Sequence, residues 1–304
     1  MKPGIHTISE TAYHADPCPA PSLSSSIAKI LLAQTPRHAW MAHPRLNPNF
    51  EPETSSEFDI GSAAHALLVG AGRDIVAVEA DSWRSSAAKE ARDRARADGK
   101  IPLLPSQYTN VVAMAAAAQA QLAHHESRAF LDAANLSERA LIWQEGKTWF
   151  RARPDRMRAD GKIIWDYKTT TNAHPDAFAR KIYDMGYDMR AEFYCRGLAR
   201  VLGTEAPAFH FIVQEKEPPY ALSVVALTPG ANGMADRKVE TAIRIWRECV
   251  EANSWPGYPS CICHVDAPGY SEKSWLDREA REEVTPFRIK QMIEWQGPLK
   301  GDSA

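Results

Sequence analysis

The sequence predicts a mixed α/β fold, in which a central mixed β-sheet is flanked by helices and preceded by a helical N-terminal region. Three observations indicate this class. Apolar residues recur at helical spacing in the first part of the chain, the period changes to two from residue 139, and a long helical pattern covers about 231–252. Helices, then strands, then a helix and more strands are typical of an α+β or α/β domain.

Length and composition fit one folded domain in a reducing cytoplasm. The chain has 304 residues, is 44% hydrophobic and carries a net charge of −2. It can therefore bury a sizeable core, and any surface that binds nucleic acid must be local. No apolar run approaches the length of about 18 residues needed for a membrane span, and the first residues lack the apolar core of a signal peptide. The five irregularly spaced cysteines predict free thiols and a cytoplasmic protein.

We expect three parts along the chain. Residues 1–22 contain prolines at positions 17, 19 and 21 and are predicted to be irregular. Residues 23–265 form the main domain. Residues 266–304 form a charged helical tail, which could pack on the domain or mediate assembly.

The first half of the main domain is predicted to be helical. The stretch "SLSSSIAKILLAQTP" begins a helix, because its serines can act as N-caps and Pro36 ends the pattern. Residues 84–98 are charged and 106–124 alanine-rich, so we expect a helical insertion over about 80–125. Another helix precedes this insertion, and its apolar stripe consists of Ile60, Ala64, Leu67 and Leu68.

Strands begin at residue 139. The stretches "RALIWQ" and "TWFRARPD" predict a β-hairpin, and "KIIWDYKTT" predicts a third strand. Helices are expected near 175–184 and 187–202, followed by a second hairpin over 208–214 and 221–227. These elements supply the strands of the predicted mixed sheet.

The stretch "RARPDRMRADGKIIWDYKTT", residues 151–170, places two carboxylates and a lysine beside these strands. Side chains alternate along a strand, so Asp166 and Lys168 share one face. If the two strands are antiparallel neighbours, Asp155 comes close to Asp166. Converging carboxylates raise each other's pKa unless a cation lies between them, and Mg²⁺ or Mn²⁺ binds such pairs. A metal with an adjacent lysine suits phosphodiester hydrolysis.

An ordinary surface ion pair is the alternative explanation of this motif. Asp-x-Lys is common on strands, and Asp166 with Lys168 would need no further purpose. The addition of Asp155 directly after Arg-Pro, and the segments on either side, favour a shared chemical task.

Five segments in the same order resemble the PD-(D/E)XK nuclease superfamily. The similarity is specifically to its RecE-like exodeoxyribonucleases of the exonuclease VIII type, and more distantly to phage lambda exonuclease and RecB-type nuclease domains. The segments are "LSSSIAKILLAQTPRHAW", "FDIGSAAHALL", "SERALIW", "RARPDRM" with "IIWDYKTT", and "GYDMRAEFY". The resemblance covers roughly residues 20–260 and implies a restriction-endonuclease-like core.

The resemblance also implies roles for the matching residues. Lys168 would position or activate the attacking water, and Glu138 would support a second metal ion or its waters. The metal ligands would be His65, Asp155, Asp166 and the Tyr167 carbonyl. We therefore expect Mg²⁺ or Mn²⁺, with two ions bound. A helix histidine at a polar edge and a solvated glutamate are the alternatives for His65 and Glu138.

Three residues of the segment "GYDMRAEFY" are candidates for DNA contact. Tyr187, Arg190 and Tyr194 fall on one face of the predicted helix. Arg190 stands where the family usually has glutamine, so a glutamine-specific contact is in doubt. An arginine there could grip a phosphate in a bidentate way. Alternatively, Tyr194 packs in the core and Arg190 is only exposed.

Further DNA contacts are expected from basic residues and from a helix N-terminus. Ser25 and Ser26 could present backbone N–H groups to a phosphate, or they could simply cap the helix. Four arginines are predicted to cluster around the metal site: Arg151, Arg153, Arg156 and Arg158.

The cysteines raise one other cofactor. Some relatives in the superfamily hold an iron–sulfur cluster with one early and three late cysteines. Here the early residue is Cys18 and the late ones are Cys249, Cys261 and Cys263, whose spacing fits no such cluster. The pattern C-x-C-H with His264 is also poor for zinc. We expect free structural thiols and no iron–sulfur cluster.

The residues themselves indicate metal-dependent hydrolysis of phosphodiesters. The resemblance implies a 5′→3′ exonuclease that resects the ends of linear double-stranded DNA and leaves a 3′ overhang for phage-type recombination. It also implies a ring-like homo-oligomer and a single-strand annealing protein as partner. The alternatives are a structure-specific or restriction-type endonuclease, and a non-catalytic DNA-binding module.

Overall fold

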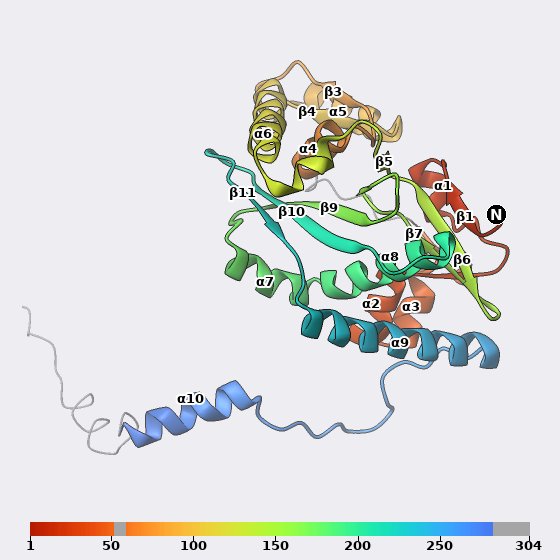
Figure 1. Cartoon of the computed structure of the whole chain (residues 1–304). Helices are drawn as coiled ribbons and strands as arrows, with labels where there is room; N and C mark the ends of the chain where they lie inside the picture. The colour runs from red at the N-terminus through yellow and green to blue at the C-terminus, as the bar shows by residue number, and fades with distance from the viewer. Residues whose placement is uncertain (52–58, 282–304) are drawn as a thin grey trace, which may run out of the picture. The chain divides into compact units, whose positions relative to one another are not determined.

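A computed structural model describes residues 1–51 and 59–281 (Figure 1). The chain divides into two compact units, Met1–Gly257 and Tyr258–Ala304. Within the described residues, we find no helix that combines the length and the apolar character needed to cross a bilayer.

Two β-sheets form the centre of the first unit. Both sheets mix parallel and antiparallel pairs, as predicted. The first has the order β1-β6-β7-β2 and contains β1 (Gly4–His6), β2 (Ser22–Ser24), β6 (Ala140–Glu145) and β7 (Thr148–Ala152). The second has the order β11-β10-β9-β8-β5 and contains β5 (Leu136–Ser137), β8 (Arg156–Met157), β9 (Ile163–Thr170), β10 (Ala208–Glu215) and β11 (Leu222–Val225).

Strand β9 lies at the centre of the second sheet. It pairs in parallel with β10, and a parallel pair needs a crossover connection. Helices α7 (Pro175–Asp184) and α8 (Tyr187–Leu202) provide it. The side chains of β9 alternate as predicted, because Ile164 enters the core beneath α8 and Trp165 enters the core on the other face. The predicted hairpin of β6 and β7 and the later pair β10 and β11 are also present.

Helices cover both faces, which confirms the predicted fold class (Figure 1). On one side lie α2 (Ser25–Ala33), α3 (Pro36–Met41), α8 and α9 (Pro229–Ala252). Helix α8 packs closely on β6, since a Cβ added at Gly197 would lie 2.6 Å from the Trp143 ring. The other side is covered by α4 (Asp59–Val69), α6 (Pro105–Ala123) and the 3₁₀-helix η1 (Glu126–Leu131). The apolar stripe of α4 is narrower than predicted, because Leu67 is exposed.

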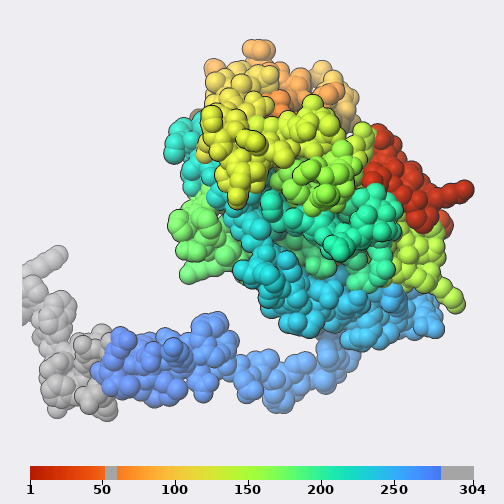
Figure 2. Space-filling view, in the orientation of Figure 1, coloured from red at the N-terminus to blue at the C-terminus, as the bar shows by residue number. Residues whose placement is uncertain are grey.

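The expected insertion over 80–125 is not wholly helical. It contains α5 (Ser86–Ala97) and α6, but also the strand β4 (Ile101–Leu103), which pairs in parallel with β3 (Ile75–Ala77). The three residues of β4 are too few to establish a period in the sequence. In the space-filling view, α6 (yellow) lies against the tip of the β10–β11 hairpin (Figure 2), where Gln121 donates to the Tyr220 carbonyl at 3.0 Å.

The prediction that residues 1–22 are irregular is wrong. This segment contains β1, the short helix α1 (Glu10–His14) and the start of β2. It is ordered by long-range pairing, since β1 adds to the edge of β6 and β2 pairs with β7. Elements of three to five residues carry no detectable periodicity, so their order comes from partners far away in the sequence.

The second unit contains α10 (Gly269–Ala280), whose residues are all exposed. This helix agrees with the helical part of the predicted tail over 266–304. The remaining residues of that prediction, 282–304, lie outside the described residues.

Candidate active site

The candidate site lies where two strands pass from one sheet to the other. Strand β5 leads into β6 through Glu138, and β7 leads into β8 through Pro154 and Asp155. Proline cannot donate to a β-ladder, so it suits a point where pairing is interrupted. The N–H of Glu138 donates to the Asp155 carbonyl at 3.0 Å and joins the two crossings.

Glu138 has an unusual backbone conformation at this crossing. Its φ is 53°, in the left-handed region that non-glycine residues seldom adopt. Such conformations cost free energy and concentrate at functional sites. The crossing therefore holds the Glu138 carboxylate in a specific place at some energetic cost.

Asp155 and Asp166 are brought together by the antiparallel pairing of β8 with β9. Arg156 lies opposite Trp165, so the preceding Asp155 lies beside Asp166. Asp155 Oδ2 accepts a hydrogen bond of 2.8 Å from the Tyr167 N–H. The expected antiparallel neighbour of β9, the hairpin strand β7, lies in the other sheet, and the short β8 pairs with β9 instead.

His65 completes a group of three possible metal ligands. Its Nε2 lies 3.3 Å from both Glu138 Oε1 and Asp155 Oδ2. The ligand atoms of these three residues all lie within 4.8 Å of one another, the only such group among the described residues. One turn earlier on α4, a Cβ added at Gly61 would lie 3.1 Å from Thr169 Oγ1. Glycine at this position lets α4 approach β9 and so places His65.

Asp166 and Lys168 lie on the other side of Asp155. The Asp166 side chain is 1% exposed and forms an ion pair with Lys168, whose Nζ is also 3.8 Å from Asp155 Oδ2. Lys168 is the partner of Asp166 Oδ2, whereas Asp166 Oδ1 accepts no hydrogen bond from any described residue. A buried carboxylate normally has its hydrogen bonds satisfied, so the unpaired oxygen of Asp166 is suited to bind a cation. The Tyr167 carbonyl, another predicted ligand, accepts from Lys168 Nζ at 3.3 Å.

The structure thus groups the predicted residues differently from the expectation. Glu138, expected to support a second ion, lies with His65 and Asp155 in the three-residue group. Asp166, expected beside His65, lies instead with Lys168 and Arg190. Asp155 forms one carboxylate pair with Glu138 and another with Asp166. Possible metal ligands therefore lie next to Asp155 in both groups.

Charge repulsion in the site is incompletely balanced by the protein. Burial raises the pKa of Glu138 to about 7, and repulsion from Asp155 adds to this effect. Burial and Asp155 likewise raise the pKa of Asp166. Burial would also raise the pKa of Asp155, but Lys168 and His65 outweigh it and hold this pKa below its usual range. A divalent cation would relieve the repulsion among these carboxylates.

Two of the three candidates for DNA contact on α8 lie beside the site. Lys168 Nζ and the Arg190 guanidinium are each 5.4 Å from the centre of the Tyr187 ring. Arg190 Nη1 is 4.0 Å from Asp166 Oδ1, and its side chain is 30% exposed. The prediction for Tyr194 is wrong, because this residue is buried in the core beneath the helix.

The four predicted arginines have separate surroundings. Arg153 lies in the site, with its Nε 2.9 Å from Glu138 Oε2. Arg151 and Arg156 are buried and hydrogen-bonded to the protein, Arg151 to Ser22 and Arg156 to backbone carbonyls. Arg158 pairs with Asp160 at a surface turn. The expectation of one basic cluster is therefore wrong except for Arg153.

The serines at the start of α2 also differ from one another. Ser24 is the N-cap, and its hydroxyl accepts from the Ile27 N–H at 3.4 Å. Ser25 is buried and Ser26 is exposed, and their contact with a phosphate through backbone N–H groups stays a prediction. Ser26 remains a candidate on grounds of access.

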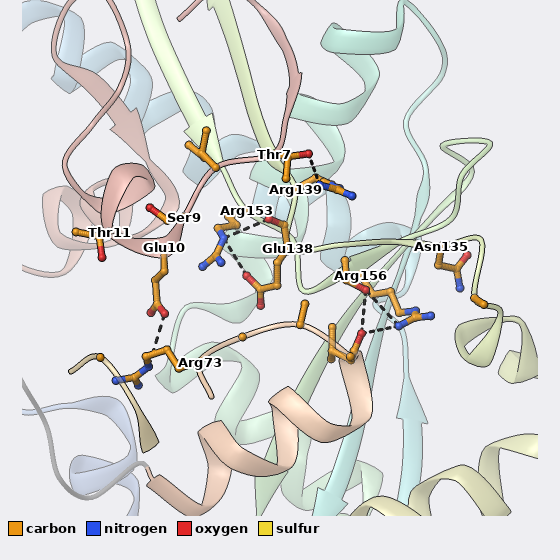
Figure 3. A pocket seen from close by; sticks show the side chains of 18 residues that line it. Thr7, Ser9, Glu10, Thr11, Arg73, Asn135, Glu138, Arg139, Arg153 and Arg156 are labelled. Carbon is orange, nitrogen blue, oxygen red and sulfur yellow. Dashed lines mark hydrogen bonds and ion pairs between the residues drawn. The ribbon is translucent and has the colours of Figure 1, made fainter. Parts of the chain in front are cut away.

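A pocket beside Glu138 was not expected from the sequence (Figure 3). It has a volume of about 730 Å³ and lies between the N-terminal segment, the loop after α4 and strand β5. Glu10, Arg73, Glu138 and Arg153 lie around one space in this view. Arg73 lies in a loop and Glu10 at the start of the five-residue helix α1, so neither carries a periodic signal and no feature of the sequence marked them.

The comparisons with known proteins agree with this fold. A family described as "PDDEXK-like domain of unknown function (DUF3799)" matches residues 24–265. No curated protein matches the sequence. A structure from Eubacterium rectale, named as a candidate exonuclease, is 15% identical with a TM-score of 0.57, covering 87% of this chain and 96% of that one. At this identity the similarity shows a shared fold.

A second structure is a phage-related exonuclease from Haemophilus somnus 129PT. It is 12% identical and covers 63% of this chain and 95% of its own, with a TM-score of 0.28, too low to carry an argument. The family match extends over most of the chain and includes every residue of the candidate site. The chain therefore belongs to the family of PDDEXK-like domains, within the PD-(D/E)XK fold predicted from its sequence.

Proposed function

We propose that the protein is a metal-dependent deoxyribonuclease that hydrolyses phosphodiester bonds at the ends of linear double-stranded DNA. One observation carries this proposal. Asp155, Asp166 and Lys168 converge with His65 and Glu138, and the buried Asp166 carboxylate has one oxygen, Oδ1, without a hydrogen-bond donor among the described residues. A structural ion-pair cluster would satisfy both oxygens of that carboxylate, whereas a hydrolytic metal site would leave one of them available.

The donor set fits hard divalent cations. Carboxylates and a backbone carbonyl are the ligands that Mg²⁺ and Mn²⁺ prefer, and one imidazole is compatible with Mn²⁺. We propose two ions, held by His65, Glu138, Asp155 and Asp166, with the Tyr167 carbonyl as a further ligand. When bound, such ions would polarise a phosphoryl oxygen and make a water more acidic.

The remaining residues can position the reacting groups and stabilise the charge that develops on them. Lys168, held between Asp155 and Asp166, can orient the attacking water or stabilise charge that develops on the phosphate. Arg190 is partly exposed beside Asp166 and can bind a phosphate oxygen of the DNA. Arg153 holds the Glu138 carboxylate from the side away from His65.

The finer features of the proposal follow from the resemblance to RecE-like enzymes. They are 5′→3′ polarity, a 3′ overhang used in phage-type recombination, a ring-like homo-oligomer and a single-strand annealing partner. We also propose a cytoplasmic location, with which the five free thiols agree. The absence of an iron–sulfur cluster stays a prediction.

Digestion of end-labelled linear duplex in Mg²⁺ tests the activity, its polarity and its dependence on ends. We expect wild type to release labelled product, and Lys168→Ala and Asp155→Ala each to lose at least about 100-fold in rate. If both variants digest DNA as fast as wild type, the site assignment fails.

An endonuclease with the same site is the second candidate, since Asp155, Asp166 and Lys168 serve either type of cut. Closed circular duplex separates the two, because a strict exonuclease leaves it intact. A non-catalytic DNA-binding module is the third, and it predicts no metal binding that depends on Asp166 in a calorimetric titration.

A further inference from the structure

The pocket beside Glu138 has the composition of an anion site. Four arginines and two glutamates line it: Arg73, Arg139, Arg153, Arg156, Glu10 and Glu138. Its volume of about 730 Å³ falls within the range of about 300–1,000 Å³ that is usual for ligand pockets. The excess of cations over anions favours a negatively charged occupant.

The arginines differ in how many donors they keep available. Arg156 is engaged by backbone carbonyls and supports the wall. Arg153 uses its Nε for Glu138, while its two terminal nitrogens make no hydrogen bond with the described residues. Arg139 donates one N–H to Thr7 Oγ1. A guanidinium carries five N–H donors, so Arg139 and Arg153 both retain donors suited to a phosphate.

Arg73 and Glu10 form the outer part of the pocket (Figure 3). The Nε of Arg73 lies 3.7 Å from Glu10 Oε2, too far for a hydrogen bond, and both side chains are 43% exposed. The Glu10 carboxylate therefore stands beside a weakly held guanidinium, where it would compete with an incoming anion.

The pocket shares Glu138 with the metal-ligand group, so an occupant would be continuous with the reacting phosphate. Arg190, which lies over the Tyr187 ring, is beside Asp166, the carboxylate that neighbours Asp155 on strand β9. A strand with its reacting phosphate at the carboxylates would thus meet positive charge beside Glu138, in the pocket, and beside Asp166, at Arg190.

Building on the proposed function, we infer that this pocket binds a phosphate of the DNA strand that is being hydrolysed. The bound phosphate is the neighbour of the reacting phosphodiester. Arg73, Arg139 and the free end of Arg153 supply the donors, and Glu10 weakens the attraction. This assignment gives the N-terminal segment, which the sequence predicted to be irregular, a part in substrate binding.

The test compares two exposed ion pairs, one that lines the pocket and one that lies outside it. Arg73→Gln removes a charge inside the pocket, and Arg158→Gln is its matched control, since Arg158 is 44% exposed and pairs with Asp160 outside the pocket. Glu10→Gln and Asp160→Asn form the corresponding acidic pair. All are measured on a Lys168→Ala background, so that labelled duplex is not consumed during fluorescence anisotropy.

We expect Arg73→Gln and Arg139→Gln to raise the Kd for duplex DNA roughly five-fold. Each should lower the slope of log Kd against log salt by about 0.9, the contribution of one phosphate contact. Glu10→Gln should lower the Kd, while both control variants stay within about two-fold of the background. A thermal melt establishes that each variant is folded.

Equal effects of Arg73→Gln and Arg158→Gln would overturn the inference, as would a Glu10→Gln variant that binds no more tightly than Asp160→Asn. These outcomes are distinct from failure of the proposed function. Loss of hydrolysis by wild-type protein would refute the nuclease, whereas the binding measurements report only on the pocket.

Discussion

Two clusters of charged side chains in this protein each combine an aspartate, a histidine and a cation, yet their burial and hydrogen bonding differ. In the first cluster, Asp16 accepts from the Ser22 N–H at 2.8 Å, from the Ser22 hydroxyl at 2.7 Å and from the Cys18 N–H at 3.3 Å. Arg151 and His43 lie 3.3 and 3.4 Å from the same carboxylate. Asp16 and His43 have no exposed side-chain surface.

The candidate active site is the second cluster, and its side chains are more exposed and less completely hydrogen-bonded. His65, Glu138, Asp155 and Lys168 are 14–20% exposed. Asp166 is buried, and its Oδ2 pairs with Lys168, but its Oδ1 accepts no hydrogen bond from a described residue. The surroundings of Asp16 lower its pKa, whereas those of Asp166 raise it.

A structural cluster is expected to satisfy its buried charged groups within the protein, whereas a ligand site leaves some of them available. The Asp16 cluster, in which both carboxylate oxygens accept hydrogen bonds, ties the N-terminal segment to β7 through Arg151. The active-site cluster keeps donors and carboxylates partly unpaired, at a cost to stability that a bound cation would remove. Stability and activity should therefore respond oppositely to changes in the two clusters.

The largest expected effect is the loss of activity on neutralising Asp166. Asp166→Asn should reduce hydrolysis of linear duplex by about 100- to 1,000-fold, because the charge proposed to bind the metal is removed. Its melting temperature should stay equal or rise, since the raised pKa shows that the folded protein disfavours this charge. A substantial fall in melting temperature would place Asp166 with Asp16 as a structural residue.

The reverse result is expected for Asp16. Asp16→Ala should lower the free energy of unfolding by about 3–5 kcal/mol, because Arg151 is left buried without its partner. Urea denaturation followed by tryptophan fluorescence measures this loss. The fraction that remains folded should hydrolyse DNA at the wild-type rate, and a specific loss of turnover would contradict a purely structural cluster.

Metal binding should stabilise the protein through the second cluster alone. At a free Mn²⁺ concentration 100 times its Kd, the expected gain is about 2.7 kcal/mol. His65→Ala should reduce this gain, and His43→Gln should keep it, although the latter protein starts from lower stability. Thermal melts with and without Mn²⁺ give both values, and equal gains in the two variants would remove His65 from the metal site.

Acid should weaken the Asp16 cluster by a smaller amount. Because the folded pKa of Asp16 is lowered, its contribution is complete above the unfolded value of about 3.9 and is lost as the pH falls below it. Wild type should lose on the order of 1 kcal/mol more than Asp16→Asn between pH 5 and pH 3. Parallel unfolding curves at the two pH values would show that the Asp16 charge contributes nothing.

The three arginines of one stretch illustrate what sequence reasoning could and could not decide. Arg151, Arg153 and Arg156 have the same chemistry and lie within six positions, and the sequence predicted one basic cluster. The strand changes sheet between them, so Arg151 binds Ser22, Arg153 contacts Glu138 and Arg156 supports the wall of the pocket. Their roles depend on partners that are distant in the sequence.

By itself the sequence determined the mixed fold, the main helices and strands, and the shared face of Asp166 and Lys168. These features follow from local periodicity, which each segment carries within its own residues. The tertiary structure alone decided that Glu138 joins His65 and Asp155, that Tyr194 is buried, and that residues 1–22 are ordered. Such outcomes depend on strand crossings and long-range hydrogen bonds, because these bring together residues whose spacing along the chain carries no periodic signal.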